Sequence, residues 1–86
     1  MKMDTYFQTK DLPEASLLFA KHKKLIKTNR DGKVVWFLFA DKLGCEQLAE
    51  AYWQRDAVVN VREFVDAMRC LKEQIFNREF SEVSRY

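Results

Sequence analysis

The residues best suited to catalysis or metal binding in this chain of 86 residues are one histidine and two cysteines. To act in nucleophilic or general acid–base catalysis, His22 would need an activated nucleophile or a paired acid, and the sequence shows no such partner. Cys45 falls in the first turn of a predicted helix, where the helix N-terminus can lower a thiol pKa. It also falls on the apolar stripe of that helix, which favours a buried structural thiol. A zinc site of His22, Cys45 and Cys70 would lack paired ligand spacing and a fourth ligand.

Other catalytic signatures are missing from the sequence. Helix capping and pairing along helices explain most of the 13 carboxylates. Gly32 and Gly44 are the only glycines, and no phosphate-binding glycine motif surrounds them. We therefore predict a non-enzymatic protein with no catalytic residue, no metal, no cofactor and no small-molecule substrate.

Length and composition indicate one packed domain. The chain has a mass of 10.3 kDa and is 48% apolar, with 2 Gly and 1 Pro. We expect a single domain over residues 1–86, with an ordered core at about 5–76 and a C-terminal tail at about 81–86. The longest apolar run, residues 34–40, is far shorter than the roughly 18 residues of a membrane helix. Two cysteines without a signal peptide indicate a reducing, cytoplasmic location.

Local signals predict the elements that carry these residues. Residues 5–9 favour a short strand, and the run from Asp11 to Glu14 resembles a helix start with a cap and a first-turn proline. Arg30-Asp31-Gly32 predicts a hairpin between strands 24–29 and 33–40. Asp41 and Asn60 are expected to cap two further helices. The order β-α-β-β-α-α predicts an α+β domain in which three helices pack with a three-stranded antiparallel sheet.

Apolar periodicity predicts the core. Helical and strand spacing together select the following residues: Leu18, Phe19, Phe37, Phe39, Leu48, Tyr52, Phe64, Val65, Met68 and Leu71.

The strand at 33–40 is apolar on both faces, which sets up the first candidate surface. If Phe37 and its alternate neighbours face the core, the other face must be covered or must bind something. The candidate protein interface is this second face with a tryptophan of the following helix: Val34, Trp36, Leu38 and Trp53. In the alternative, the third helix or the C-terminal Phe76 and Phe80 cover it.

Clustered positive charge gives the second candidate surface. Residues 21–33 hold six cations and one acid, a local net charge of +5, within a chain whose net charge is +2. Such a cluster could bind a phosphate backbone while Trp36 stacks on a base, or it could be a solvated strand pair. The candidate nucleic-acid-binding residues are Lys23, Lys24, Lys27, Arg30 and Lys33.

Scattered positions over residues 5–76 carry a family resemblance. They include Tyr6-Phe7-Gln8-Thr9-Lys10-Asp11-Leu12 with Ala15, Phe37-Leu38-Phe39-Ala40-Asp41, Ala51-Tyr52-Trp53, and Val61-Arg62-Glu63-Phe64 leading to Ala67 and Leu71-Lys72. This pattern resembles a family of small bacterial and phage proteins known only as a domain of unknown function. The resemblance implies a fold more than an activity. Where that family carries glycine after the first helix, this chain has Lys21-His22-Lys23.

Together these observations predict a small interaction or regulatory module of bacterial, phage or mobile-element origin. We expect it to act by binding a protein, either a second copy in a homodimer or another chain. The alternative is a nucleic-acid-binding accessory protein that uses the basic hairpin of residues 21–33.

Overall fold

The computed structural model describes the backbone of residues 6–84 and the side chains of residues 6–75. In chain order it contains β1 (Tyr6–Thr9), α1 (Leu12–Ala20), β2 (Leu25–Asp31), β3 (Val34–Ala40), α2 (Lys42–Trp53) and α3 (Val61–Ser84). The strands form one antiparallel sheet in the order β1-β3-β2. The predicted α+β class and the predicted order of elements are confirmed. Helix α3 includes residues 81–84 of the expected tail.

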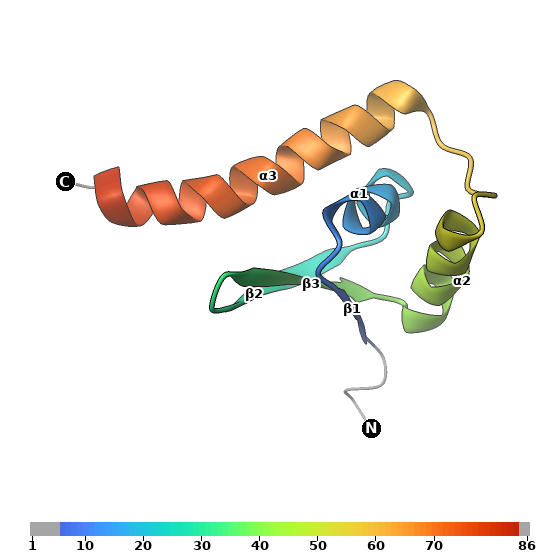
Figure 1. Cartoon of the computed structure of the whole chain (residues 1–86), viewed down its shortest axis with the longest axis horizontal. Helices are drawn as coiled ribbons and strands as arrows, with labels where there is room; N and C mark the ends of the chain where they lie inside the picture. Colours follow the sequence, from blue (N-terminus) through green and yellow to red (C-terminus); the bar gives the residue numbers. More distant parts are fainter. Residues whose placement is uncertain (1–5, 85–86) are drawn as a thin grey trace.

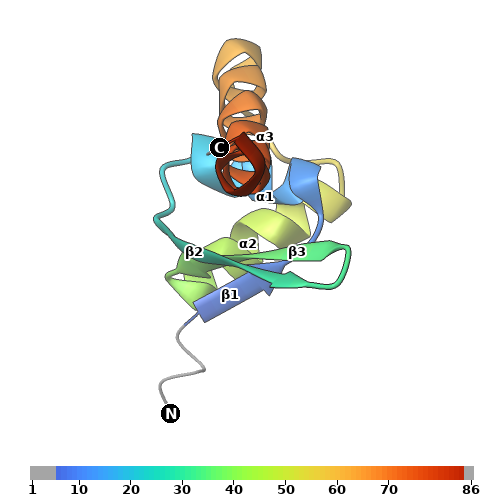
Figure 2. The ribbon, with the colours of Figure 1, turned by 90° about the vertical axis from the view of Figure 1, so that its left-hand side faces the viewer.

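The helices form a layer on one side of the sheet. Figures 1 and 2 show α1 lying on the sheet with α3 stacked on α1, while α2 stands at one end of the sheet. None of these helices lies on the opposite face of the sheet (Figure 2). Among the elements that the structure describes, all three helices therefore pack on one side of the sheet.

Helix α1 begins and ends with well-formed caps. The Asp11 carboxylate accepts a hydrogen bond from the Glu14 N–H at 2.8 Å, and a proline occupies the first turn, as the sequence predicts. At the other end, the N–H groups of His22 and Lys23 donate to the carbonyls of Phe19 and Leu18, each at 3.0 Å. This bond pattern is a Schellman motif. His22 takes its left-handed position with φ of 70°, so it lies just beyond the end of the helix.

The β2–β3 hairpin turns one residue later than the Asp31-Gly32 dipeptide suggested. Asp31 pairs with Val34, which leaves Gly32 and Lys33 as a two-residue loop. Gly32 has a φ of 65°, a conformation that glycine adopts without steric cost. The register then shifts between Leu25 and Lys27 through a bulge that the sequence analysis did not predict.

The core lies between the sheet and α1. Phe37 and Phe39 of β3 are 1% and 0% exposed, and they pack with the following buried residues: Ala15, Leu18, Cys45 and Leu71. Five of the other predicted core residues are only half-buried: Phe19, Leu48, Tyr52, Phe64 and Met68. Val65 was wrongly assigned to the core, because its side chain is 45% exposed.

The way in which α3 packs explains why Val65 is exposed. This helix packs mainly on α1, with Ala67 and Leu71 as its buried contacts. Ala67 is small, so the two helices can approach closely along the line that joins it to Leu71. Val61 and Val65 lie off this line and stay exposed, although their spacing fits an apolar stripe equally well.

We expect the substitution Phe37→Ala to lower the free energy of unfolding by about 3 to 5 kcal/mol, the range for truncating a buried phenylalanine. Phe64→Ala should cost clearly less, because Phe64 is only half-buried. Urea unfolding of both variants against the parent protein measures the difference. Equal losses would contradict the core described above.

Two helix ends offer a second stability test. His22 and Arg55 both have φ near 70°, at 70° and 67°, and each follows a helix in the position that glycine favours. We expect His22→Gly and Arg55→Gly each to raise the free energy of unfolding by about 1 kcal/mol, because the left-handed strain is removed. Lys21→Gly is the control, since Lys21 has φ of −88° and gains nothing from glycine. Unchanged urea midpoints for His22→Gly and Arg55→Gly would refute the left-handed conformation of these two residues.

Candidate functional site

The uncovered face of the sheet carries a row of apolar side chains. Because side chains alternate along a strand, burial of Phe37 and Phe39 turns Val34, Trp36 and Leu38 to the other side. Val34 is 37% exposed, and Trp36 and Leu38 are half-buried. These three residues form the centre of what we call the open sheet face. The sequence left open which face of this strand is buried, and the burial of Phe37 and Phe39 shows that the face of Val34, Trp36 and Leu38 is not the core face.

Polar residues of the neighbouring strands flank this row. Gln8 of β1 and Lys27 of β2 both pair with Leu38, and Asn29 pairs with Trp36. Cross-strand partners share a face of the sheet, so these side chains belong to the open sheet face as well. Lys10 reaches over the Trp36 ring, with its Nζ 5.8 Å from the ring centroid. The open sheet face thus has an apolar centre, a polar rim and a cation on each side.

The fourth predicted interface residue, Trp53, lies elsewhere. It is 63% exposed at the end of α2, and its ring contacts Tyr52 edge-on at a centroid distance of 5.0 Å. Its indole N–H donates to Glu14 Oε2 at 2.8 Å. Since Glu14 belongs to α1, which covers the inner face of the sheet, Trp53 is attached to the helix side and is not part of the open sheet face.

The carboxylate that holds Trp53 is a polar centre that sequence reasoning missed. Glu14 is only 6% exposed, and its second oxygen, Oε1, accepts a hydrogen bond from the Thr9 hydroxyl. Thr9 in turn accepts a bond from the Asp11 N–H at 3.1 Å. The sequence pointed to Glu14 only as part of a helix start, and the one local signal for this network was a threonine two residues before the cap.

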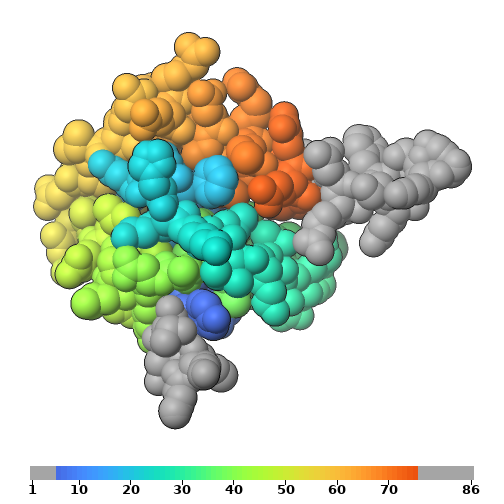
Figure 3. Space-filling view, turned by 180° about the vertical axis from the view of Figure 1, so that it is seen from behind, coloured from blue at the N-terminus to red at the C-terminus, as the bar shows by residue number. Residues whose placement is uncertain are grey.

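The basic segment does not form one continuous surface. Seen from behind, the end of α1 and the start of β2 lie at the surface between α3 and α2 (Figure 3). Lys27 belongs to the open sheet face, whereas Arg30 pairs with Val35 and therefore belongs to the inner face. Lys24 is exposed just before β2, and Lys33 is exposed in the hairpin loop.

The fifth basic residue, Lys23, is already paired. Its Nζ lies 2.7 Å from Asp41 Oδ2, and Asp41 also caps α2 by accepting from the Gly44 N–H at 3.1 Å. The hydrogen bond between the two side chains raises the pKa of Lys23 and lowers that of Asp41. A Cβ at position 44 would overlap the ends of both side chains, so a larger residue there would push the pair aside. This pairing removes one cation from the proposed nucleic-acid surface.

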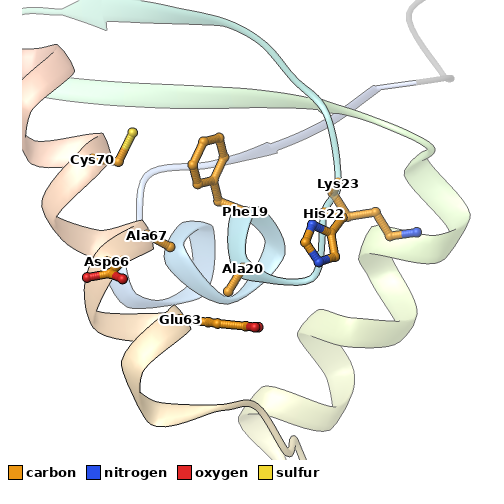
Figure 4. A pocket seen from close by; sticks show the side chains of 8 residues that line it. All are labelled: Phe19, Ala20, His22, Lys23, Glu63, Asp66, Ala67 and Cys70. Atoms are coloured by element: carbon orange, nitrogen blue, oxygen red, sulfur yellow. The ribbon is translucent and has the colours of Figure 1, made fainter.

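The residues considered for metal or thiol chemistry are separated. His22 and Cys70 line one pocket between α1 and α3, and Figure 4 shows them on opposite sides of Phe19. Cys45 is absent from that pocket. It is fully buried, and its thiol lies 3.3 Å from the Ala40 carbonyl oxygen. Among the side chains of residues 6–75, no group of three or more His, Cys, Asp or Glu residues is placed to hold a metal ion.

Comparisons with models of known protein families, with curated proteins and with solved structures find no match for this chain. The resemblance to a small bacterial and phage family therefore stays a prediction. Within residues 6–84, no helix has both the length and the apolar character needed to cross a membrane.

Burial decides between the two interpretations of Cys45. Desolvation raises the pKa of its thiol to about 11, in the direction opposite to that of a reactive cysteine at a helix N-terminus. At about pH 7, we expect a maleimide to modify the half-buried Cys70 much faster than Cys45. The measurement is peptide mapping over a time course, with the urea-unfolded protein as the reference. Rapid modification of Cys45 in the folded protein would contradict its burial.

The raised pKa of Cys45 also predicts how the stability of the protein depends on pH. The folded pKa lies above the ordinary value of 9.0, so the buried neutral thiol contributes full stability below about pH 9 and loses it as the pH rises towards 11. The stability difference between the parent protein and Cys45→Ala should therefore shrink over that window.

Proposed function

We propose that this protein is a small non-enzymatic interaction module of bacterial, phage or mobile-element origin, which binds an acidic protein partner through the open sheet face. The observation that carries the proposal is the row Val34, Trp36 and Leu38 on the central strand, which none of the described helices covers. An apolar centre with a large aromatic residue and a polar rim is the usual anatomy of a protein interface.

Charge favours another protein over a second copy. Lys10 and Lys27 stand on opposite sides of the apolar row, one beside β1 and the other on β2. In a face-to-face homodimer, the flanking lysines of one copy would lie against those of the other, and like charges suppress such pairing. A partner with an acidic rim would meet both cations with opposite charge. It would also gain a faster encounter rate.

Nucleic-acid binding is the alternative, and one feature favours it. Lys10 and Lys27 flank Trp36 on the same face, which is the arrangement of a base-stacking platform beside phosphate contacts. The rest of the basic segment argues against it, because Lys23 is paired with Asp41 and Arg30 belongs to the other face. Binding of a protein partner needs only the residues of the open sheet face, and not the rest of the basic segment.

Site-specific photo-crosslinking tests the proposal. A photoreactive amino acid is placed at Gln8, on the open sheet face, or at Gln47, an exposed glutamine of α2 that serves as the matched control. In a lysate of the source organism, we expect an adduct with an acidic protein from position 8 and none from position 47. Trp36→Ala in the same chain should weaken capture by at least about 2 kcal/mol, or roughly thirtyfold, as for an interface hot spot.

The other outcomes overturn the proposal in distinguishable ways. Adducts between two copies would replace the acidic partner with a homodimer. Adducts to nucleic acid at position 8, lost steeply with salt, would favour the alternative function. Equal adducts from positions 8 and 47, or capture unchanged by Trp36→Ala, would exclude the open sheet face. Circular dichroism and urea unfolding of the Trp36→Ala chain establish that it is folded.

A further inference from the structure

The side of α3 that is turned away from α1 is uncovered in the described part of the chain. Figures 1 and 2 show α3 as the outermost helix, with no other described helix or strand on its far side. Val61 and Val65 are 76% and 45% exposed. Together with the half-buried Met68 they follow the spacing i, i+4 and i+7, which aligns them along one stripe of the helix. Helix α3 thus presents a second apolar row, on the opposite side of the molecule from the open sheet face.

A row of exposed charged side chains runs beside this apolar row. Its members repeat at the same spacing and alternate in sign: Arg62, Asp66, Arg69 and Glu73. Within the helix, the Asp66 carboxylate lies 3.8 Å from Arg62 Nε and 3.6 Å from Arg69 Nη1. These side chains are 52% to 86% exposed, and contacts of this length at the surface hold charged groups only loosely. The row can therefore also pair with charges of another chain.

The order of signs in the charged row is complementary to its own reverse. When two copies of α3 lie antiparallel about a two-fold axis near Ala67, Arg62 of one copy lies opposite Glu73 of the other. In the same arrangement, Asp66 lies opposite Arg69 of the second copy. Symmetry repeats both pairs, so every member of the row meets an opposite charge. A parallel arrangement would place each residue opposite its own copy, and like charges would meet at every position.

The apolar row fits the same antiparallel arrangement. Val65 lies opposite Met68 of the second copy, about an axis within one residue of that of the charged row. Val61 lies opposite Lys72, which is exposed and continues the apolar row at the next spacing. The aliphatic part of a lysine can cover an apolar neighbour while its ammonium group stays in water. Association thus removes apolar surface from water without burying a charge.

We propose that two copies of this protein associate through antiparallel α3 helices, with the apolar row at the centre and the charged row beside it. Lys10 and Lys27 oppose the pairing of two open sheet faces, whereas the alternating charges of α3 favour the pairing of two helices. The open sheet faces of such a dimer point outwards, so each copy can still bind the acidic partner. Because the apolar row is short, the dimer dissociates on dilution.

Sedimentation equilibrium of the full chain over about 1 μM to 1 mM tests the proposal. We expect a reversible monomer–dimer equilibrium for the parent protein. Asp66→Arg puts a positive charge opposite Arg69, and Arg69→Glu puts a negative charge opposite Asp66, so each variant alone should dimerise at least tenfold more weakly. Lys33→Glu is the control. It changes the net charge as much as Arg69→Glu does, at an exposed position of the hairpin loop, and should leave the dimer unchanged.

An equimolar mixture of Asp66→Arg and Arg69→Glu provides the sharpest measurement. In a mixed antiparallel dimer, positions 66 and 69 again carry opposite charges at both symmetry-related contacts. We expect the mixture to recover the dimerisation of the parent protein, which mixing could not restore if either variant had failed to fold.

Several outcomes would overturn the α3 dimer. These are a parent protein that stays monomeric to about 1 mM, single variants that dimerise like the parent, an equal effect of Lys33→Glu, or a mixture that stays monomeric. A dimer that Trp36→Ala abolishes and both charge variants retain would also overturn it, because the second copy would then lie on the open sheet face.

Discussion

Glu14 is where three elements of the fold are joined. Its two carboxylate oxygens accept hydrogen bonds from Thr9 at the end of β1 and from Trp53 at the end of α2, and Glu14 itself lies in the first turn of α1. A carboxylate that is 6% exposed would be costly without these donors. Each donor is therefore held in place, because loss of either would leave a buried oxygen unsatisfied. The position of α1 on the sheet follows from this network.

One-sided packing follows from that placement. A chain of 86 residues has enough helix to cover one face of a three-stranded sheet, and Glu14 together with Phe37 and Phe39 determines which face this is. The other face of β3 keeps the apolar residues that a second layer would normally cover. The open sheet face is thus a consequence of the core. Its apolar row, in which Val34 is exposed while Trp36 and Leu38 are half-buried, is the surface from which the proposed protein binding is argued.

The sequence was most informative where a residue acts on the backbone close to it in the chain. Asp11 and Pro13 begin α1, Asn60 accepts from the Glu63 N–H at 3.0 Å at the start of α3, and the alternation of β3 assigned its two faces. These effects are local, so a few consecutive residues suffice to predict them. Val65 shows the limit, since the buried side of a helix depends on what it packs against. The Glu14 network was missed for a related reason, because Trp53 is 39 residues away in sequence.

The bulge at Ile26 shows how a single residue controls the electrostatics of both faces. In a regular strand, Leu25 and Lys27 would share a face, and the inward position of Leu25 would draw Lys27 towards the core. The bulge instead pairs Leu25 with Phe39 and Lys27 with Leu38, so that Leu25 stays inside and Lys27 joins the open sheet face. From that point Arg30 falls on the inner face of the sheet. The +5 charge of residues 21–33, which appears as one cluster in the sequence, is thereby divided between two surfaces with different chemistry.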